Sequence, residues 1–349
     1  MVLLRKSSVL RFYKKHTESR MGNPLRRYLY HYLIGIGGVG TLSYFILMYH
    51  LAGWEAKKHG NASGYFVCSP SMMDFFWMLP INRISDFFGS LSDVGTLSPR
   101  VHHALISALV WLFQIDLSES RQGSFDSLQD FYTREWKPEC RPINRAAVGI
   151  SPCDGVIVEL LENIPGDVMF RVKGYTYGVR SLFRSYPPSV PEGYKRVAVV
   201  IRMRLADFHH VIAPTRFYCE ESVYVPGALL PTTVAGYHWL PGVLALNERI
   251  VVRGKCADNV GNVFLAMVGS TLTGKMKLSF DERVRTNFLD PPDYAVFSKY
   301  RVKPLLAVGS PVGVFLWGSS LVLMMDVPNS AKFQPKRGDI VKAGEALWI

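Results

Sequence analysis

Short runs of apolar and β-branched residues follow one another after Phe131, and they constrain the fold more than any other feature of the chain. The runs are GVIVEL, VMFRV, RVAVVIRM, ERIVVRG, NVFLAMVGS and FLWGSSLVLMMDV. Gly and Pro clusters separate many of them, and no clear helical pattern lies between them. We therefore expect residues 131–349 to form a β-rich body of one or two sheets. The final KRGDIVKAGEALWI predicts a turn, a strand, a second turn and a last short strand.

The front of the chain has a different composition. Residues 1–31 hold eight Lys and Arg against one acid, with Ser and apolar residues between them, which is typical of a mitochondrial targeting leader. Residues 32–53 carry no Asp, Glu, Lys or Arg, and Tyr and Trp lie near both ends of this run. A run of this length can cross a bilayer, so we predict one transmembrane helix over 32–54, with a buried core helix as the alternative.

Residues 55–130 combine apolar clusters with sparse charges in a helical pattern. We interpret them as a membrane-associated helical region, and packing against the protein body is the alternative. Together these segments predict an α+β protein. It would have a β-rich catalytic body, an N-terminal helical membrane-docking layer and one N-terminal transmembrane helix.

Charge and cysteine content exclude several function classes. The net charge is +12, and residues 1–60 supply +8 of it, so the folded body lacks the spread of basic residues that nucleic-acid binding needs. The five cysteines form no CxxC pair and their number is odd. We therefore expect reduced thiols, with neither a disulfide framework nor a metal site.

Several residues could carry chemistry. Asp154 lies in SPCDG at the start of a strand, where Asp is also a common turn residue. His209 and His210 follow the strand RVAVVIRM, and neighbours on a strand point to opposite faces, so at most one of them faces a given site. Serine hydroxyls follow glycine at Ser270, Ser310 and Ser319. Taken singly, these residues leave open an enzyme based on serine, histidine and aspartate, and no GxSxG motif is present.

Taken together, the sequence blocks from about Leu79 to Ile349 resemble phosphatidylserine decarboxylase of the mitochondrial and bacterial branch. The blocks include SPCDGVI, VKGYTYGVRSLF, DFHHVIAP, VYVPGALLP, LALNERIVV, AMVGSTLTG and GVFLWGSSLVLMMDVP, in the family's order. AMVGSTLTG resembles an internal strand of the family. Only Gly313 to Pro328 fits the context of the family's Gly-Ser-Ser/Thr signature, although Trp317 stands where Leu is more usual.

The resemblance implies that the Gly318–Ser319 bond cuts itself. The Ser319 hydroxyl would attack the preceding carbonyl, and elimination and hydrolysis would leave a covalent pyruvoyl group at the new amino terminus. A β chain ending at Gly318 and an α chain of residues 319–349 would remain non-covalently associated. The pyruvoyl ketone would condense with the serine amine of phosphatidylserine and accept electrons as carbon dioxide leaves, which gives phosphatidylethanolamine.

The histidine block departs from the family pattern. Asp154 corresponds to the family's aspartate, and His209 corresponds to its first histidine, which is tied to decarboxylation. The second histidine position, the base toward the serine, is Ile212, which cannot accept a proton. General-base catalysis is typically worth about 10²–10⁴-fold. Either His210 or another base substitutes, or the bond cleaves slowly with Asp154 and His209 alone, or the chain is not processed.

Three function classes follow. We expect a decarboxylase with Ser319, Asp154, His209 and His210 as its catalytic residues and no metal. The competing class is an unprocessed pseudoenzyme that acts as a membrane-bound partner or regulator. A membrane-anchored serine hydrolase that uses Ser270 or Ser319 is disfavoured, because neither serine lies in a suitable motif. The leader and the span predict a single-pass protein of the mitochondrial inner membrane, and the sequence allows a homodimer.

Overall fold

The computed structural model describes residues 68, 85, 89, 90 and 92 and the ranges 98–164, 170–172, 175–257, 260–271, 274–288, 291–316 and 320–349. The predicted leader at 1–31 and the predicted transmembrane helix at 32–54 lie outside these residues. Within the described ranges, no helix is long and apolar enough to cross a membrane. The region predicted to associate with the membrane, 55–130, is described mainly from residue 98 onward.

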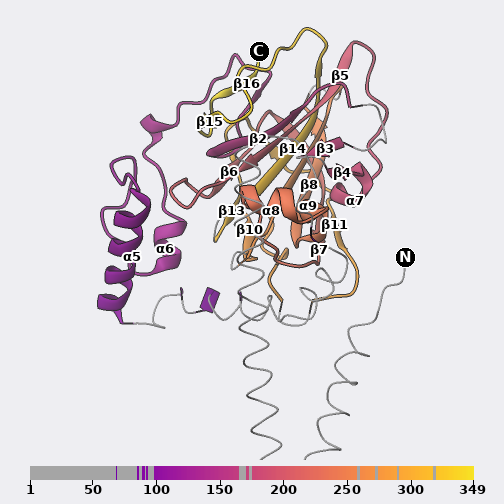
Figure 1. Ribbon diagram of the computed structural model, residues 1–349. Helices are drawn as coiled ribbons and strands as arrows, with labels where there is room; N and C mark the ends of the chain where they lie inside the picture. Colours follow the sequence, from indigo (N-terminus) through magenta and orange to yellow (C-terminus); the bar gives the residue numbers. More distant parts are fainter. Residues whose placement is uncertain are drawn as a thin grey trace, which may run out of the picture.

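A nine-stranded antiparallel sheet forms the centre of the described part (Figure 1). Across the sheet, the strands are β11 (Val296–Lys299), β7 (Phe217–Val225), β8 (Arg249–Cys256), β9 (Asn262–Val268), β14 (Ser320–Pro328), β5 (Tyr194–Arg202), β2 (Gly155–Leu161) and β15 (Ile340–Val341), with β12 (Leu305–Leu306) beside β7. β14 pairs with β5 over its whole length and with β9 on its other edge. The strand that begins at Ser320 therefore lies in the middle of the sheet.

Three smaller sheets complete the β structure. A three-stranded sheet has the order β10 (Met276–Leu278), β13 (Pro311–Phe315) and β6 (His210–Ile212). Two-stranded ribbons join β1 (Gly149–Ile150) to β16 (Ala346–Trp348) and β3 (Phe170–Val172) to β4 (Tyr175–Tyr177). β15 and β16, with a turn between them, confirm the order of elements that KRGDIVKAGEALWI predicts.

The described helices fall into two groups. α5 (Pro99–Phe113), α6 (Leu128–Tyr132) and the 3-10 helix η1 (Pro138–Cys140) precede the sheets, and α5 stands to one side of them (Figure 1). α7 (Val179–Phe183), α8 (Val234–Trp239) and α9 (Val243–Leu246) lie within the β-rich body. We expected no helices among these strands. Segments of four to six residues are too short to show a helical period in the sequence, which explains the difference.

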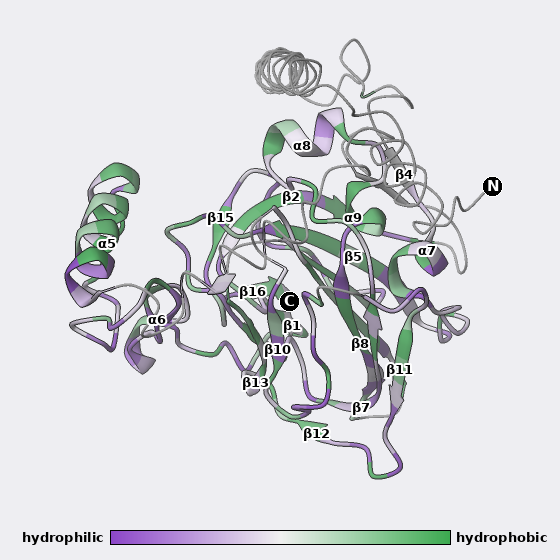
Figure 2. Ribbon diagram, turned by 90° about the horizontal axis from the view of Figure 1, so that it is seen from below, coloured by the Kyte–Doolittle hydropathy of each residue, from purple (hydrophilic) through white to green (hydrophobic). Residues whose placement is uncertain are grey.

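The central sheet is buried on both faces. Leu321, Leu323 and Met325 of β14 pack in one apolar cluster with residues of the three-stranded sheet. Val322 and Met324 pack in a second cluster with residues of α7, α8 and α9. Figure 2 shows hydrophobic residues along the strands between these layers. This arrangement confirms the β-rich α+β body, and it places the start of β14 deep in the protein.

Candidate active site

The Gly-Ser pair singled out by the sequence stands where the chain leaves one sheet and enters another. β13 ends at Phe315 and belongs to the three-stranded sheet, whereas β14 begins at Ser320 in the central sheet. Gly318 and Ser319 themselves lie outside the described residues. The apolar run that reads as one strand is therefore two strands in two sheets, and the predicted cleavage site falls in the connection.

Ser320 is the described residue closest in sequence to the predicted cleavage site. It is fully buried, and its hydroxyl is hydrogen-bonded to the Tyr237 hydroxyl of α8. The Tyr237 hydroxyl is also buried, and burial raises the pKa of Tyr237 to about 12. The phenol is therefore protonated at neutral pH. A polar pair that is shielded from water thus flanks the position of Ser319 in the chain.

The hydroxyls of Ser270 and Ser310, two other serines that follow a glycine, have structural partners. Ser270 Oγ accepts a hydrogen bond from the Thr232 N–H at 3.0 Å. Ser310 Oγ donates to the Ala307 carbonyl at 2.7 Å, in a turn at the surface. Each of these two hydroxyls therefore has a local role in holding a loop, which agrees with the choice of Gly318–Ser319 as the functional pair.

Asp154 is buried and held by three N–H donors. Arg141 forms a two-pronged contact with its carboxylate, from Nε to Oδ1 at 2.9 Å and from Nη2 to Oδ2 at 2.6 Å. The backbone N–H of Ala343 donates to Oδ1 at 2.8 Å. Arg141 also pairs with Glu119 at 2.9 Å, and Glu119 pairs with Lys342 at 2.7 Å. This network ties Asp154 to both the front of the described chain and its C-terminal segment.

His209 lies in the loop between β5 and β6, and its ring is fully buried. No hydrogen bond of ordinary geometry reaches either ring nitrogen in the described part of the chain, although the Tyr132 backbone lies close enough to raise the pKa of the ring slightly. The Tyr132 ring meets it edge-on at 5.7 Å. Burial, and then the positive charge of Arg134, lower the pKa of His209 to about 3. His209 is therefore a neutral imidazole with a free acceptor nitrogen at physiological pH.

The backbone brings His209 close to the end of β13. The Phe315 N–H donates to the His209 carbonyl at 3.0 Å, so β13 is held beside the histidine loop just before the predicted cleavage site. Asp207, in the same loop, is paired with Arg204 at 2.6 Å and closes the turn. The loop thus fixes His209 by main-chain contacts and not by side-chain hydrogen bonds.

Ile212 and His210 have surroundings that differ from those of His209. The Ile212 N–H donates to the Pro152 carbonyl at 2.8 Å, so this position lies beside the Asp154 segment. The Ile212 side chain is buried in an apolar cluster with Ile150 and Ala343. His210 Nε2 lies 2.9 Å from the Thr133 carbonyl oxygen, and its ring packs edge-on against Trp136.

A hydrogen bond to a carbonyl oxygen requires the proton on Nε2 of His210. This leaves Nδ1 as the only acceptor on that ring. Ile212 therefore places an aliphatic side chain beside the Asp154 segment. The structure keeps Asp154 satisfied through Arg141 instead.

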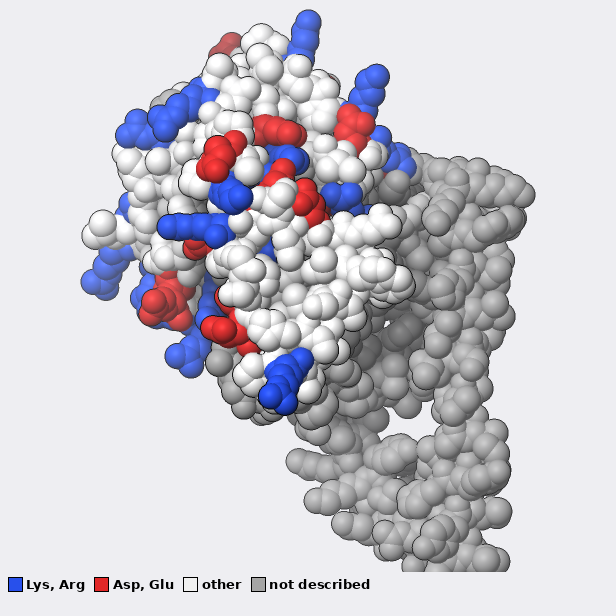
Figure 3. All heavy atoms as spheres, turned by 90° about the vertical axis from the view of Figure 1, so that its left-hand side faces the viewer, with Lys and Arg blue, Asp and Glu red and all other residues white. Residues whose placement is uncertain are grey.

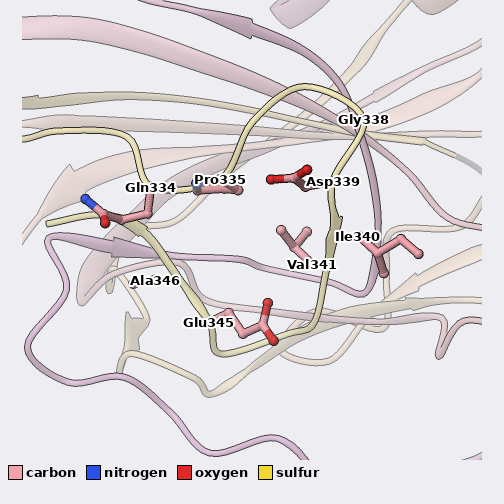
Figure 4. Close-up of a pocket in the computed structure, with 8 residues that line it drawn as sticks. All are labelled: Gln334, Pro335, Gly338, Asp339, Ile340, Val341, Glu345 and Ala346. Atoms are coloured by element: carbon pink, nitrogen blue, oxygen red, sulfur yellow. The ribbon is translucent and has the colours of Figure 1, made fainter.

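Two residues of this region gave no signal in the sequence. Arg141 is thirteen positions from Asp154 across a loop, so only the fold shows that they meet. Tyr237 is on a six-residue helix far from Ser320 in sequence. A shallow hollow in the C-terminal segment contains none of the predicted site residues, although its Val341 pairs with Gly155, next to Asp154. It is lined by Gln334, Pro335, Gly338, Asp339, Ile340, Val341, Glu345 and Ala346 (Figure 4). Among the described residues, no group of His, Cys, Asp and Glu could hold a metal ion.

Comparison with known proteins identifies the family. The phosphatidylserine decarboxylase family model matches residues 128–348. The phosphatidylserine decarboxylase proenzyme of Legionella pneumophila strain Philadelphia 1 is 29% identical over 262 residues, which cover 74% of this chain and 89% of the relative. The mitochondrial phosphatidylserine decarboxylase proenzyme of Rattus norvegicus is 26% identical over 300 residues, covering 77% and 72%. A Helicobacter pylori phosphatidylserine decarboxylase proenzyme is 32% identical over 275 residues, covering 76% and 96%. The chain therefore belongs to the phosphatidylserine decarboxylase family of enzymes.

Proposed function

We propose that the chain is a phosphatidylserine decarboxylase that generates its own pyruvoyl group from Ser319. One observation carries the proposal: within the family match, the Gly-Ser-Ser sequence leads directly into β14, the buried central strand, and the chain changes sheets just before it. The relatives named above are proenzymes, which supports a chain that is processed after synthesis.

The proposed processing consists of balanced steps at one peptide bond. The Ser319 hydroxyl attacks the Gly318 carbonyl, the amide C–N bond breaks, and an ester replaces it. Loss of the Ser319 Cα proton then expels the Gly318 carboxylate. The remaining dehydroalanine amino terminus takes up water and releases ammonia, which leaves the pyruvoyl group. Each proton transfer needs an acceptor or donor at the site.

His209 and Asp154 are the residues proposed to serve these steps and the later decarboxylation. The neutral imidazole of His209 offers a nitrogen that can accept a proton transiently, and its buried position keeps competing water away. The Asp154 carboxylate is preorganised by Arg141 and Ala343. The pyruvoyl group supplies an electron sink for the bond to carbon dioxide, and no metal is required.

Ile212 is the feature that opposes the proposal, because it removes the family's usual base toward the serine. His210 can contribute only through Nδ1, since its Nε2 is engaged with the Thr133 carbonyl. We therefore propose slow cleavage assisted by Asp154 and His209. Membership of an enzyme family supports this over the unprocessed alternative.

The arrangement of strands supports a stable two-chain product. β14 would belong to the α chain, yet it lies between β5 and β9 of the β chain. Asp326 of β14 forms a fully buried ion pair with Arg196 of β5 at 2.7 Å. β15 and β16 pair with β2 and β1 in turn. After cleavage at Gly318, the strands of the α chain would therefore remain hydrogen-bonded to strands of the β chain.

α5 supports membrane docking. Trp111, Leu112 and Phe113 at its C-terminal end are 80%, 62% and 47% exposed. On the face that carries α5, charged residues gather in one part, and a broad, largely uncharged area lies beside them (Figure 3). Exposed apolar side chains like these three on α5 are typical of a protein that meets lipid. With the predicted leader and span, it supports a single-pass protein of the mitochondrial inner membrane, and a homodimer remains compatible with it.

An activity assay tests the proposed function. The full chain, purified in detergent, should release carbon dioxide from phosphatidylserine in mixed micelles and form phosphatidylethanolamine. The Ser319→Ala variant should be inactive, because it lacks the oxygen that attacks the peptide bond. A wild-type preparation that is folded and fully cleaved, yet inactive on phosphatidylserine, would refute the substrate. A folded but uncleaved and inactive preparation would favour the pseudoenzyme.

A further inference from the structure

Arg202, the last residue of β5, lies directly beside the start of β14. Its Cα is the register partner of Ser320 on one side and of Val156 of β2 on the other. Side chains of directly opposed residues in antiparallel strands project from the same face of the sheet. The Ser320 side chain faces α8, where it bonds Tyr237, so the Arg202 side chain leaves the sheet on that face too.

The Arg202 guanidinium has no counter-ion in the described part of the chain. Its Nε is buried without a hydrogen-bond partner, and no described carboxylate pairs with the group. Other buried arginines are used differently: Arg141 and Arg196 hold carboxylates, and Arg249 donates to four backbone carbonyls. The buried Nε of this half-buried side chain is a donor without an acceptor, which points to a ligand.

The chain itself places this cation close to the reaction. Ser319 precedes Ser320, and consecutive Cα atoms are about 3.8 Å apart. Opposed Cα atoms of an antiparallel pair are about 4.5–5.5 Å apart. The Cα of Arg202 is therefore about 5 Å from the Cα of Ser320, the residue that directly follows Ser319 in the chain. The positive charge of Arg202 also acts on Tyr237, where it partly offsets the rise in pKa that burial produces.

The proposed substrate carries two anionic groups that could meet this cation. The carboxylate must lose its charge as carbon dioxide leaves, so an arginine paired with it would oppose the reaction. The phosphodiester keeps its charge throughout and is only a few bonds from the reacting amine. Arginine also matches phosphate oxygens with two parallel N–H donors. We infer that Arg202 binds the phosphodiester of the phosphatidylserine headgroup, an inference that rests on the proposed function.

A second anion near this position is the carboxylate that cleavage would create at Gly318. It differs from the phosphodiester in what it would affect. A contact with the Gly318 carboxylate would influence cleavage or the association of the two chains. A contact with the phosphodiester would influence only the binding of substrate, because the same contact exists before and during decarboxylation.

Steady-state kinetics of the full chain in mixed micelles test the inference. Arg202→Met removes the charge and keeps an apolar stem, and Arg202→Lys restores a charge without the two-pronged geometry. Arg121→Met is the matched control, because Arg121 forms an exposed surface pair with Glu135. We expect Arg202→Met to cleave as the wild type does. Its KM for phosphatidylserine should rise about 10- to 100-fold, with kcat within about threefold of the wild type.

The Arg202→Lys variant should have an intermediate KM, and the Arg121→Met variant should match the wild type. Phosphatidic acid, which keeps the phosphate and lacks the amine, should inhibit the wild type and inhibit Arg202→Met more weakly. If Arg202→Met does not fold, Arg202→Lys alone gives the comparison. An unchanged KM in the variants of an active wild type overturns the inference and leaves the proposed function intact.

Slow cleavage with a normal KM would also overturn the inference, and it would assign Arg202 to the Gly318 carboxylate. If the wild type itself is inactive on phosphatidylserine, the proposed function fails first, and the inference fails with it. The wild-type assay therefore separates the two failures.

Discussion

Removal of Arg141 should destabilise the protein by leaving the Asp154 carboxylate buried without its counter-ion. The side chains of Arg141 and Asp154 are only 2% and 5% exposed, and their atoms meet at 2.6 Å. Loss of one partner of such a pair costs about 3–5 kcal/mol. Asp154 keeps its bond from Ala343, so we expect Arg141→Met to lower the free energy of unfolding by about 3 kcal/mol.

Urea unfolding of the full chain in detergent, followed by tryptophan fluorescence, measures this change. A Ser319→Ala background keeps every sample as one chain, so cleavage cannot alter the result. The double variant Arg141→Met/Asp154→Asn removes both charges and should recover about 2 kcal/mol of the loss. The exposed pair of Arg121 provides the control, and Arg121→Met should change stability by under about 0.5 kcal/mol. A loss under about 1 kcal/mol for Arg141→Met would refute the view that Asp154 depends on Arg141.

Three further predictions concern a buried acid, a hydroxyl pair and the exposed helix. Burial raises the pKa of Glu248 from 4.5 to about 7, so the folded chain binds this proton more tightly than the unfolded chain does. The stability that Glu248 contributes is then lost as the pH rises from about 4.5 to about 7. Between these pH values, Glu248→Gln should reduce the slope of the unfolding free energy against pH by up to about 1.4 kcal/mol per pH unit. Identical slopes for the wild type and the variant would contradict this. Tyr237→Phe leaves the buried Ser320 hydroxyl unpaired and should cost about 1–3 kcal/mol, whereas adding Ser320→Ala should cost little more, as a double-mutant cycle of unfolding free energies would show. The double variant Trp111→Gln/Leu112→Gln should bind anionic vesicles at least about tenfold more weakly in a sedimentation assay, without a lower melting temperature. Unchanged vesicle binding would argue against α5 as a docking surface.

The β-rich body can be predicted from the sequence because β-branched apolar runs indicate strands from local residues alone. Strands β5, β9 and β14 coincide with three of those runs. The break between β13 and β14 has no such signal. Both strands are apolar, so the run appears continuous, and only their hydrogen-bond partners show that they belong to different sheets.

The candidate site divides in the same way. His209 and Asp154 are found from motif blocks, because their neighbours in sequence identify them. Arg141 and Arg202 are not, since ordinary surface arginines have the same sequence signature, and their roles depend on which strand ends and loops the fold brings together. Ile212 illustrates the reverse case. The family resemblance predicts that the usual base is missing at this position, and the structure shows that the Ile212 side chain lies in an apolar cluster.

Mass spectrometry of the C-terminal region tests the central claim most directly. If Ser319 becomes a pyruvoyl group, the denatured protein should yield a fragment of residues 319–349 that resists amino-terminal sequencing. Its mass should be lower than that of the seryl peptide by the mass of one ammonia molecule, and Ser319→Ala should abolish it. A single intact chain that spans Gly318 and Ser319 with an unmodified serine, in a folded wild-type preparation, would contradict the account.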